Sequence, residues 1–92
     1  MQILQTNRFK KAYKKFHPNQ LEIVNKTIKT IINNPKIGEQ KKGDLFWLRV
    51  YKFKIKNQLI LLGYTLKENK ELIMILVSIA SHENFYRDLK NS

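Results

Sequence analysis

The side chains best suited to chemistry follow the most apolar stretch of the chain, residues 72–80. His82 comes soon after this stretch, and Tyr86 follows four residues later, about one turn of a helix. An imidazole can act as an acid or a base near neutral pH. Together with a phenol on a cationic surface, it could form a site that cuts RNA. The structural alternative is that His82 only begins a helix and Tyr86 packs beneath it.

Arg49 is a second candidate, because it lies within a run of aromatic and β-branched residues. A charged side chain in such a strand must reach water, a partner or an anion. If the chain cuts RNA, we expect Arg49 to hold the scissile phosphate, with Lys52 or Lys54 assisting. The alternative is a guanidinium group stacked at the surface on Trp47 or Tyr51.

The positive charge is unevenly distributed. The 92 residues carry 18 Lys and Arg against 7 Asp and Glu, a net charge of +11, and residues 1–56 account for all of the excess. Such a field attracts polyanions, so nucleic acid is the leading partner and an acidic protein the second. Four lysines are expected to contact RNA backbone, although a solvated helix face is the alternative: Lys10, Lys11, Lys14 and Lys15.

Composition narrows the class of protein further. The chain has no Cys, which excludes disulfides and suits a reducing cytoplasm. No apolar run approaches the ~20 residues of a membrane helix, and the first residues do not resemble a signal peptide. The two histidines lie far apart with no carboxylate at ligand spacing, so we expect neither a metal nor a cofactor. His17, beside Pro18, is interpreted as a turn residue rather than a catalyst.

Apolar periodicity predicts an α+β chain that forms one domain, residues 1–92. The predicted elements are a strand at 2–5, helices at 7–16 and 19–33, strands at 45–54, 58–66 and 72–80, and a short C-terminal helix. Residues 36–44 are predicted to form a polar loop. The two long helices should form an antiparallel hairpin that covers one face of an antiparallel three-stranded meander.

Strand alternation predicts which side chains share a face. Arg49 should lie on the same face of its strand as Tyr51 and Phe53. The β-branched residues of the last strand are expected to face the helices: Ile73, Ile75, Val77 and Ile79. The other face of that strand becomes small at Ser78 and Ala80, which leaves room for a ligand beside His82.

This order of elements resembles the RelE/ParE superfamily of bacterial toxins. The resemblance covers nearly the whole chain and includes short stretches at residues 34–35, 38–39, 42–45, 48–53, 58–59 and 81–89. It implies a toxin made together with an antitoxin, whose acidic, partly disordered segment wraps the basic surface. RelE-type members cut mRNA in the ribosomal A site through its 2′-hydroxyl group, whereas ParE-type members poison DNA gyrase and lack RNase chemistry.

The resemblance also suggests roles for single residues. Arg49 matches an arginine that many members carry in the first meander strand, and His82 and Tyr86 match a histidine and an aromatic residue of one nuclease branch. Glu39 falls near an acidic residue that some nucleases use as a base. Gln58 stands near the place where many nucleases have an arginine.

We therefore expect a cytoplasmic, ribosome-dependent mRNA endoribonuclease that inhibits translation without a metal. The predicted catalytic residues are His82, Arg49, Tyr86 and Lys52. The predicted RNA-contacting residues are Lys10, Lys11, Lys14, Lys15, Lys54 and Gln58. Two alternatives stay open: a ParE-like gyrase inhibitor, and a degenerate protein that binds only its antitoxin or nucleic acid.

Overall fold

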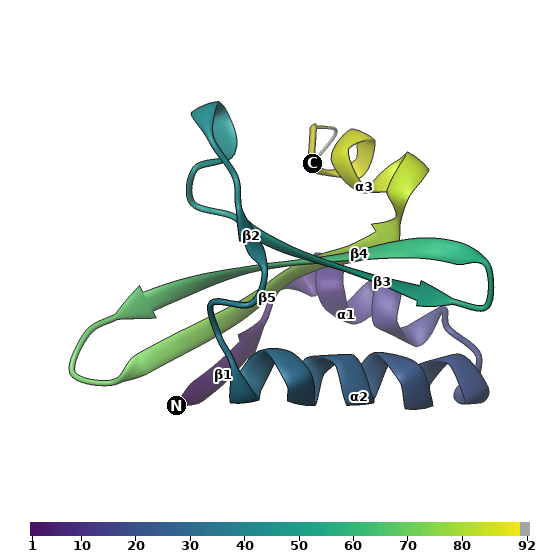
Figure 1. The fold of residues 1–92 in the computed structure, drawn as a ribbon, viewed down its shortest axis with the longest axis horizontal. Helices are drawn as coiled ribbons and strands as arrows, with labels where there is room; N and C mark the ends of the chain where they lie inside the picture. Colours follow the sequence, from purple (N-terminus) through teal and green to yellow (C-terminus); the bar gives the residue numbers. More distant parts are fainter. Residues whose placement is uncertain (91–92) are drawn as a thin grey trace.

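Three helices pack against a five-stranded sheet in the computed structural model, which describes residues 1–90 (Figure 1). The elements follow in the order β1 (Gln2–Gln5), α1 (Asn7–Lys14), α2 (Pro18–Asn33), β2 (Glu39–Gln40), the 3₁₀ turn η1 (Gly43–Leu45), β3 (Arg49–Ile55), β4 (Gln58–Glu68), β5 (Leu72–Ser81) and α3 (His82–Lys90). The predicted α+β fold, with an N-terminal strand, two helices, a meander and a C-terminal helix, is confirmed.

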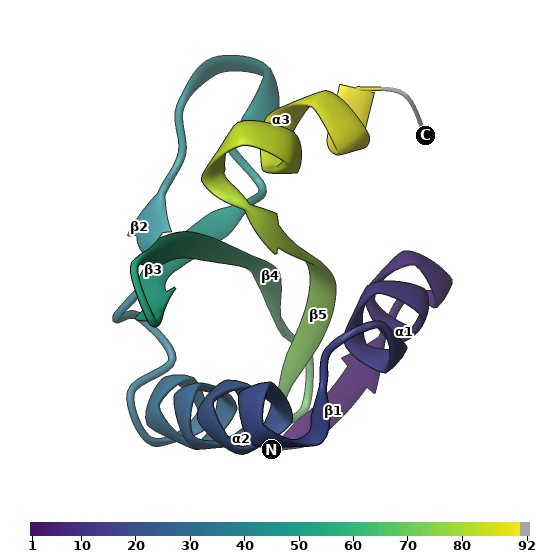
Figure 2. The same cartoon turned by 90° about the vertical axis from the view of Figure 1, so that its right-hand side faces the viewer.

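The sheet has the strand order β1-β5-β4-β3-β2. Strands β3, β4 and β5 form the antiparallel meander, while β1 pairs with β5 in parallel at one edge. Helix α2 lies on one side of this sheet and α3 on the other (Figure 2). Because α3 follows β5 directly, the first residues of α3 are held by the end of a central strand.

Each helical side of the sheet has its own core. Phe9 of α1 and Val24 and Ile31 of α2 pack with Tyr64 of β4 in the larger one. The smaller core joins α3 to the meander through four fully or almost fully buried residues: Leu48, Val50, Leu61 and Phe85. The second core fixes α3 on the sheet and thereby positions the side chains that α3 carries.

The helices begin and end where local chemistry allows. The Thr6 hydroxyl accepts a hydrogen bond from the Phe9 N–H at 3.1 Å and donates one to the Val77 carbonyl oxygen at 2.7 Å. It therefore caps α1 and ties it to β5. Helix α1 ends at Lys14, two residues before the predicted end. No helix within residues 1–90 is long and apolar enough to span a membrane.

A β-bulge in β5 overturns the predicted division of that strand into two faces. The pairing passes from Gly63–Ser78 to Tyr64–Leu76, so Val77 is an extra residue in β5. Leu76 and Ile79 consequently both lie in the core beneath α1 and α2, while Val77 packs on the α3 side. The prediction that Ile73, Ile75, Val77 and Ile79 share the helix-covered face is therefore wrong.

The predicted polar loop contains a short edge strand, and the first meander strand begins later than predicted. Glu39 and Gln40 pair with Val50 and Arg49 as β2. Residues 43–45 form the turn η1, so β3 begins at Arg49 instead of residue 45. These differences matter for function because β2 carries one side chain of the candidate site.

Candidate functional site

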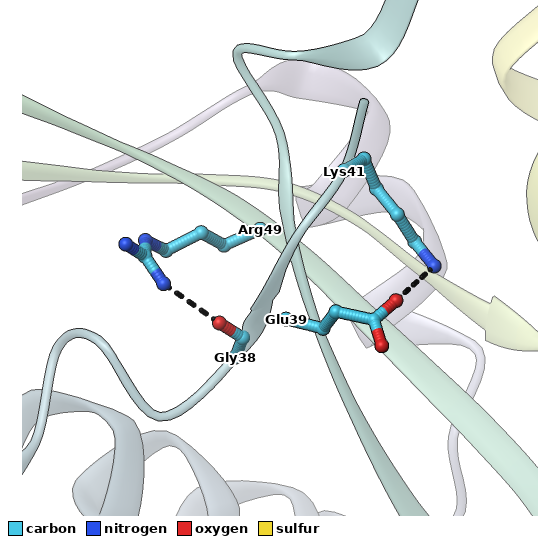
Figure 3. A network of polar contacts seen from close by, with 4 residues as sticks. All are labelled: Gly38, Glu39, Lys41 and Arg49. Carbon is cyan, nitrogen blue, oxygen red and sulfur yellow. Dashed lines mark hydrogen bonds and ion pairs between the residues drawn. The ribbon is translucent and has the colours of Figure 1, made fainter. Parts of the chain in front are cut away.

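A carboxylate, an ammonium group and an aromatic ring meet between β2 and α3. Lys41 Nζ lies 2.7 Å from Glu39 Oε1 (Figure 3). The same Nζ atom lies 5.7 Å from the centroid of the Tyr86 ring, within the range of a cation–π contact. These three residues, Glu39, Lys41 and Tyr86, are called the β2–α3 cluster below.

The pairing of β2 with β3 places Glu39 on the α3 side of the sheet. Glu39 lies directly opposite Val50, which packs in the core beneath α3. Residues opposite each other in a ladder share a face, so Glu39 points toward α3 as Val50 does. Lys52 and Lys54 follow Val50 at intervals of two and therefore share this face. Both lysines are exposed, and Lys52 is close enough to Glu39 for its charge to lower the pKa of that carboxyl.

The charges of the cluster depend on one another. The hydrogen bond from Lys41 lowers the pKa of Glu39 most, and the charges of Lys41, Lys52 and Lys42 lower it further. The hydrogen bonds with Glu39 and then Tyr86 raise the pKa of Lys41. Near neutral pH the cluster therefore presents an ionised carboxylate paired with a protonated ammonium group.

Arg49 lies on the opposite face of the sheet, together with Tyr51 and Phe53, as strand alternation predicted. Its guanidinium Nη1 donates hydrogen bonds to the carbonyl oxygens of Gly38 at 2.8 Å and Lys36 at 3.2 Å. Figure 3 shows the Arg49 side chain turning away from Glu39 and Lys41. The structure thus does not bring Arg49 together with Tyr86. Nη1 of Arg49 binds the main chain, and Nη2 donates to the side-chain Oε1 of Gln40 at 3.4 Å.

His82 is the first residue of α3 and is exposed, one helical turn before Tyr86. It borders a groove with Gln58 and with Gln20 of α2, beside the turn between β3 and β4. Two of the predicted residues, His82 and Gln58, are therefore neighbours. They lie toward one end of α3, and Tyr86 lies beyond them along the helix.

The lysines of α1 and Lys15, which directly follows α1, form a separate surface. All four are exposed: Lys10, Lys11, Lys14 and Lys15. Lys11 and Lys15 border a groove between α1 and α3 to which Asn84 of α3 and His17 also contribute. This basic groove runs along the side of α3, so a polyanion lying in it would pass close to the helix that carries His82 and Tyr86.

Lys41 is the residue that sequence reasoning overlooked. It belongs to a segment predicted to be an irregular loop, where alternation was not considered. The available signal was the spacing of Glu39 and Lys41, since residues two apart in a strand share a face. Recognising the two-residue strand β2 would have been required to use it.

The described residues thus combine an α+β fold with an exposed basic face that carries the β2–α3 cluster. The sequence matches the family model described as ParE-like toxin of type II bacterial toxin–antitoxin system over residues 3–90. The chain therefore belongs to the ParE-like toxins of type II bacterial toxin–antitoxin systems. No curated protein sequence matches the chain significantly.

Solved structures of Escherichia coli RelE have the same fold. The toxin in the intact RelBE toxin–antitoxin complex is 18% identical with a TM-score of 0.65, and the match covers 86% of this chain and 93% of that one. The isolated toxin is 17% identical with a TM-score of 0.65, covering 98% of this chain and 96% of that one. At this identity the likeness establishes the fold alone.

Proposed function

We propose that this toxin is an endoribonuclease that cuts mRNA on the ribosome without a metal and is inhibited by an acidic antitoxin. The observation that carries the proposal is the β2–α3 cluster: a carboxylate, an ammonium group and an aromatic ring on the α3 side, with Lys52 near the carboxylate. Cleavage through the 2′-hydroxyl group needs a base, cations for the developing charge and an acid for the leaving oxygen.

Glu39 is proposed as the base. Its carboxylate is exposed and ionised, so it can take the proton from the attacking 2′-hydroxyl group. The 2′-oxygen then bonds to the neighbouring phosphorus, and the bond from phosphorus to the 5′-oxygen breaks. The products are a 2′,3′-cyclic phosphate and a 5′-hydroxyl end.

Lys41 and Lys52 are proposed to stabilise the extra negative charge on the phosphorane. Both act on Glu39 electrostatically, so a phosphate bound between them would lie near the base. Tyr86 would stack on a base of the RNA, because its ring already forms one wall of the cluster. His82, one turn earlier on α3, is proposed to give its proton to the leaving 5′-oxygen.

Arg49 is assigned a positioning role in this scheme. Its hydrogen bonds to the carbonyl oxygens of Lys36 and Gly38 hold the segment from which β2 begins. The role expected from the resemblance, a direct contact with the scissile phosphate, is replaced by one that acts through the placement of Glu39.

The proposed partners are the ribosome with its mRNA and an acidic antitoxin. The net charge of +11 and the exposed lysines of α1 favour both. A related fold, that of RelE, occurs in a complex with an antitoxin. By analogy, the antitoxin of this toxin is expected to cover the α3 side.

A second candidate function, inhibition of DNA gyrase, is favoured by the family description as ParE-like. Gln58 also supplies no cation beside His82. In this function the same basic surface would bind a protein, and the β2–α3 cluster would have no chemical role.

One experiment separates the two functions. The variants Glu39→Gln, Lys41→Gln and His82→Gln would be compared with the control variant Lys29→Gln. Lys29 is exposed on α2, away from the cluster. Cleavage of mRNA on purified ribosomes should fall ~10²-fold for each cluster or acid variant and stay unchanged for the control. Unchanged cleavage in the cluster variants, or loss of gyrase supercoiling with no cleavage by the wild type, would overturn the nuclease proposal.

A further inference from the structure

The groove between α1 and α3 has the end of β5 as its floor. It encloses about 810 Å³, which is within the range of ligand-binding clefts. The last four residues of β5, Ser78 to Ser81, all line it. Ser78 and Ala80 lie opposite Gly63 and Leu61 of β4, so their side chains point to the α3 side of the sheet. Small side chains at these two positions leave the floor of the groove open.

Ser78 places an unpaired hydroxyl group in this floor. The residue is only 2% exposed, and its hydroxyl has no hydrogen-bond partner within residues 1–90. No fully buried side-chain oxygen of these residues lacks a partner, so the Ser78 Oγ atom must reach the groove itself. A polar group in an almost buried position is costly unless something bonds to it. The hydroxyl is therefore available to a ligand in the groove.

The main chain of β5 also has an unpaired edge at this point. Strand β1 pairs only with residues 73–76 of β5. Beyond them, the Thr6 hydroxyl donates to the Val77 carbonyl oxygen, which therefore points toward α1. Main-chain groups two residues apart in a strand point the same way, so those of Ile79 face this side too. No hydrogen bond from α1 or β1 reaches Ile79 in the described part of the chain, which leaves it a donor and an acceptor for a ligand.

The walls of the groove are cationic. Arg8, Lys11 and Lys15 line it on the α1 side, against the carboxylate of Asp88 on α3. Cations around a floor of neutral hydrogen-bonding groups match a ligand that has anionic groups on one side and a neutral polar edge on the other. A nucleotide has both parts, because its phosphate is anionic and its base carries donors and acceptors.

The groove is continuous with the neighbouring groove beside His82. Gln20 and Ser81 line both of them. A single strand of RNA that fills the first groove can therefore extend to His82 in the second. An extended acidic peptide could also pair with the main chain of Ile79, but the proposed function gives it no reason to continue toward His82.

We infer that the groove between α1 and α3 is a nucleobase subsite for single-stranded RNA. The base is held by the Ser78 hydroxyl and the main chain of Ile79, and the adjoining phosphates lie on the cations of the α1 side. The choice of RNA rests on the proposed function, which the inference extends with a contact to a base away from the β2–α3 cluster. Ser78 is thus a binding residue that takes no part in the chemistry.

The test compares two probes that differ only in their bases. One is single-stranded oligodeoxyadenylate, which has no 2′-hydroxyl group and cannot be cut by the proposed chemistry. The other is an abasic oligodeoxynucleotide of the same length, which keeps the phosphates. Ser78→Ala removes the hydroxyl group from the floor, and Thr30→Ala, which removes a hydroxyl group from the exposed side of α2, is the matched control.

The wild type should bind oligoadenylate more tightly than the abasic probe. Ser78→Ala should weaken oligoadenylate binding about fivefold, leave abasic binding and the salt dependence unchanged, and not lower Tm, because the hydroxyl has no partner in the fold. Lys11→Gln should weaken both probes and reduce the slope of log K against log salt by about 0.7. Thr30→Ala should change neither affinity.

Four results would each overturn the inference: equal affinity of the wild type for both probes, unchanged oligoadenylate binding by Ser78→Ala, the same loss in Thr30→Ala, and a lowered Tm of Ser78→Ala. A fifth is binding of polyglutamate that Ser78→Ala weakens as strongly, since it would assign the groove to an acidic peptide. None of these measurements records RNA cleavage. Failure here therefore leaves the nuclease proposal to its own test with the Glu39, Lys41 and His82 variants.

Discussion

Arg49 and Gly38 are joined by a hydrogen bond of 2.8 Å from the guanidinium Nη1 to the carbonyl oxygen. The hydroxyl of buried Tyr64 holds the same segment from β4, donating to the Pro35 carbonyl oxygen at 2.7 Å and accepting from the Gly38 N–H at 2.9 Å. Burial raises the pKa of Tyr64, so this hydroxyl keeps its proton at neutral pH. Residues 35–38 are thus fixed before the chain enters β2. Glu39 of β2 then lies on the α3 side of the sheet, opposite to the face that carries Arg49.

The first prediction concerns Arg49→Gln. Loss of the hydrogen bonds to Lys36 and Gly38 should loosen β2 and lower RNA cleavage through misplacement of Glu39 and Lys41. The salt dependence of RNA binding distinguishes this role from a phosphate contact. A lost phosphate contact would reduce the slope of log K against log salt by about 0.7–0.9, whereas a positioning residue should leave the slope unchanged.

The second prediction concerns Tyr64→Phe. The change leaves the buried Gly38 N–H and the Pro35 carbonyl oxygen without their partner, which should cost about 1–3 kcal/mol in the free energy of unfolding. For a domain of this size, each kcal/mol corresponds to roughly 4–8 °C in Tm. Tyr51→Phe, which removes a hydroxyl on half-buried Tyr51, is the matched control and should change Tm little. Equal Tm changes in the two variants would contradict the role of this hydroxyl.

The third prediction concerns Gly63, on which α3 rests. A Cβ atom at Gly63 would lie 2.6 Å from Phe85 Cζ and 3.1 Å from Leu48 Cδ1. Gly63→Ala should therefore displace α3, destabilise the fold by about 1–3 kcal/mol, and alter the environment of Trp47. Gly43→Ala is the control: it is strained because Gly43 has a φ of 67°, but it meets no atom within 4 Å. At a temperature where both variants are folded, Gly43→Ala should cleave RNA faster than Gly63→Ala.

The order of the elements was predictable because apolar periodicity and turn residues are local signals. The two helices predicted at 7–16 and 19–33 and the three long strands follow from such patterns, although α1 ends earlier and β3 begins later than predicted. The β5 bulge was not predictable, because Val77 is left unpaired only when its neighbours Leu76 and Ser78 pair with β4. Strand β2 was missed for the same reason: its two residues are ordered by β3 rather than by their own propensities.

The candidate site was predictable only in part. Tyr86 and Lys52 do lie on the α3 side, as residues of the same basic surface. Arg49 lies on the other face, as strand alternation predicted, but no sequence pattern reveals that its guanidinium group binds the main-chain carbonyl oxygens of Lys36 and Gly38. The association of Lys41 with Tyr86 joins residues far apart in the chain and required the packing of α3.

The fourth prediction concerns the pH dependence of the Glu39–Lys41 ion pair. The pKa of Glu39 is lowered from its ordinary value of 4.5, so the pair's stabilisation is present above that value and is lost as the pH falls through the lowered pKa. The pKa of Lys41 is raised from 10.5, so the stabilisation persists up to that value and is lost as the pH rises through the raised pKa.

The variant Glu39→Gln measures this contribution. Its Tm should be lower than that of the wild type between these limits, and the difference should disappear in more acidic solution. High salt should also diminish the difference, because both side chains are close to solvent. A Tm difference that is independent of pH and salt would show that the ion pair does not form in solution.

The last prediction concerns the four exposed lysines of α1. If Lys10, Lys11, Lys14 and Lys15 contact phosphates, replacing all four with Gln should flatten the dependence of RNA or ribosome binding on salt. Each lost contact should remove about 0.7–0.9 from the slope of log K against log salt. The fold should change little, because the core-facing residues Phe9 and Ala12 of α1 are retained.

A second fourfold variant controls for net charge. It replaces four other exposed lysines with Gln, which lie on α2 or around the turn between β4 and β5: Lys26, Lys29, Lys67 and Lys70. Both variants reduce the net charge equally, so a general field effect would flatten the slope equally in both. A larger change for the α1 variant assigns the contacts to the groove between α1 and α3, where Lys11 and Lys15 lie beside α3. Equal slopes would show that the α1 lysines only contribute to the overall field.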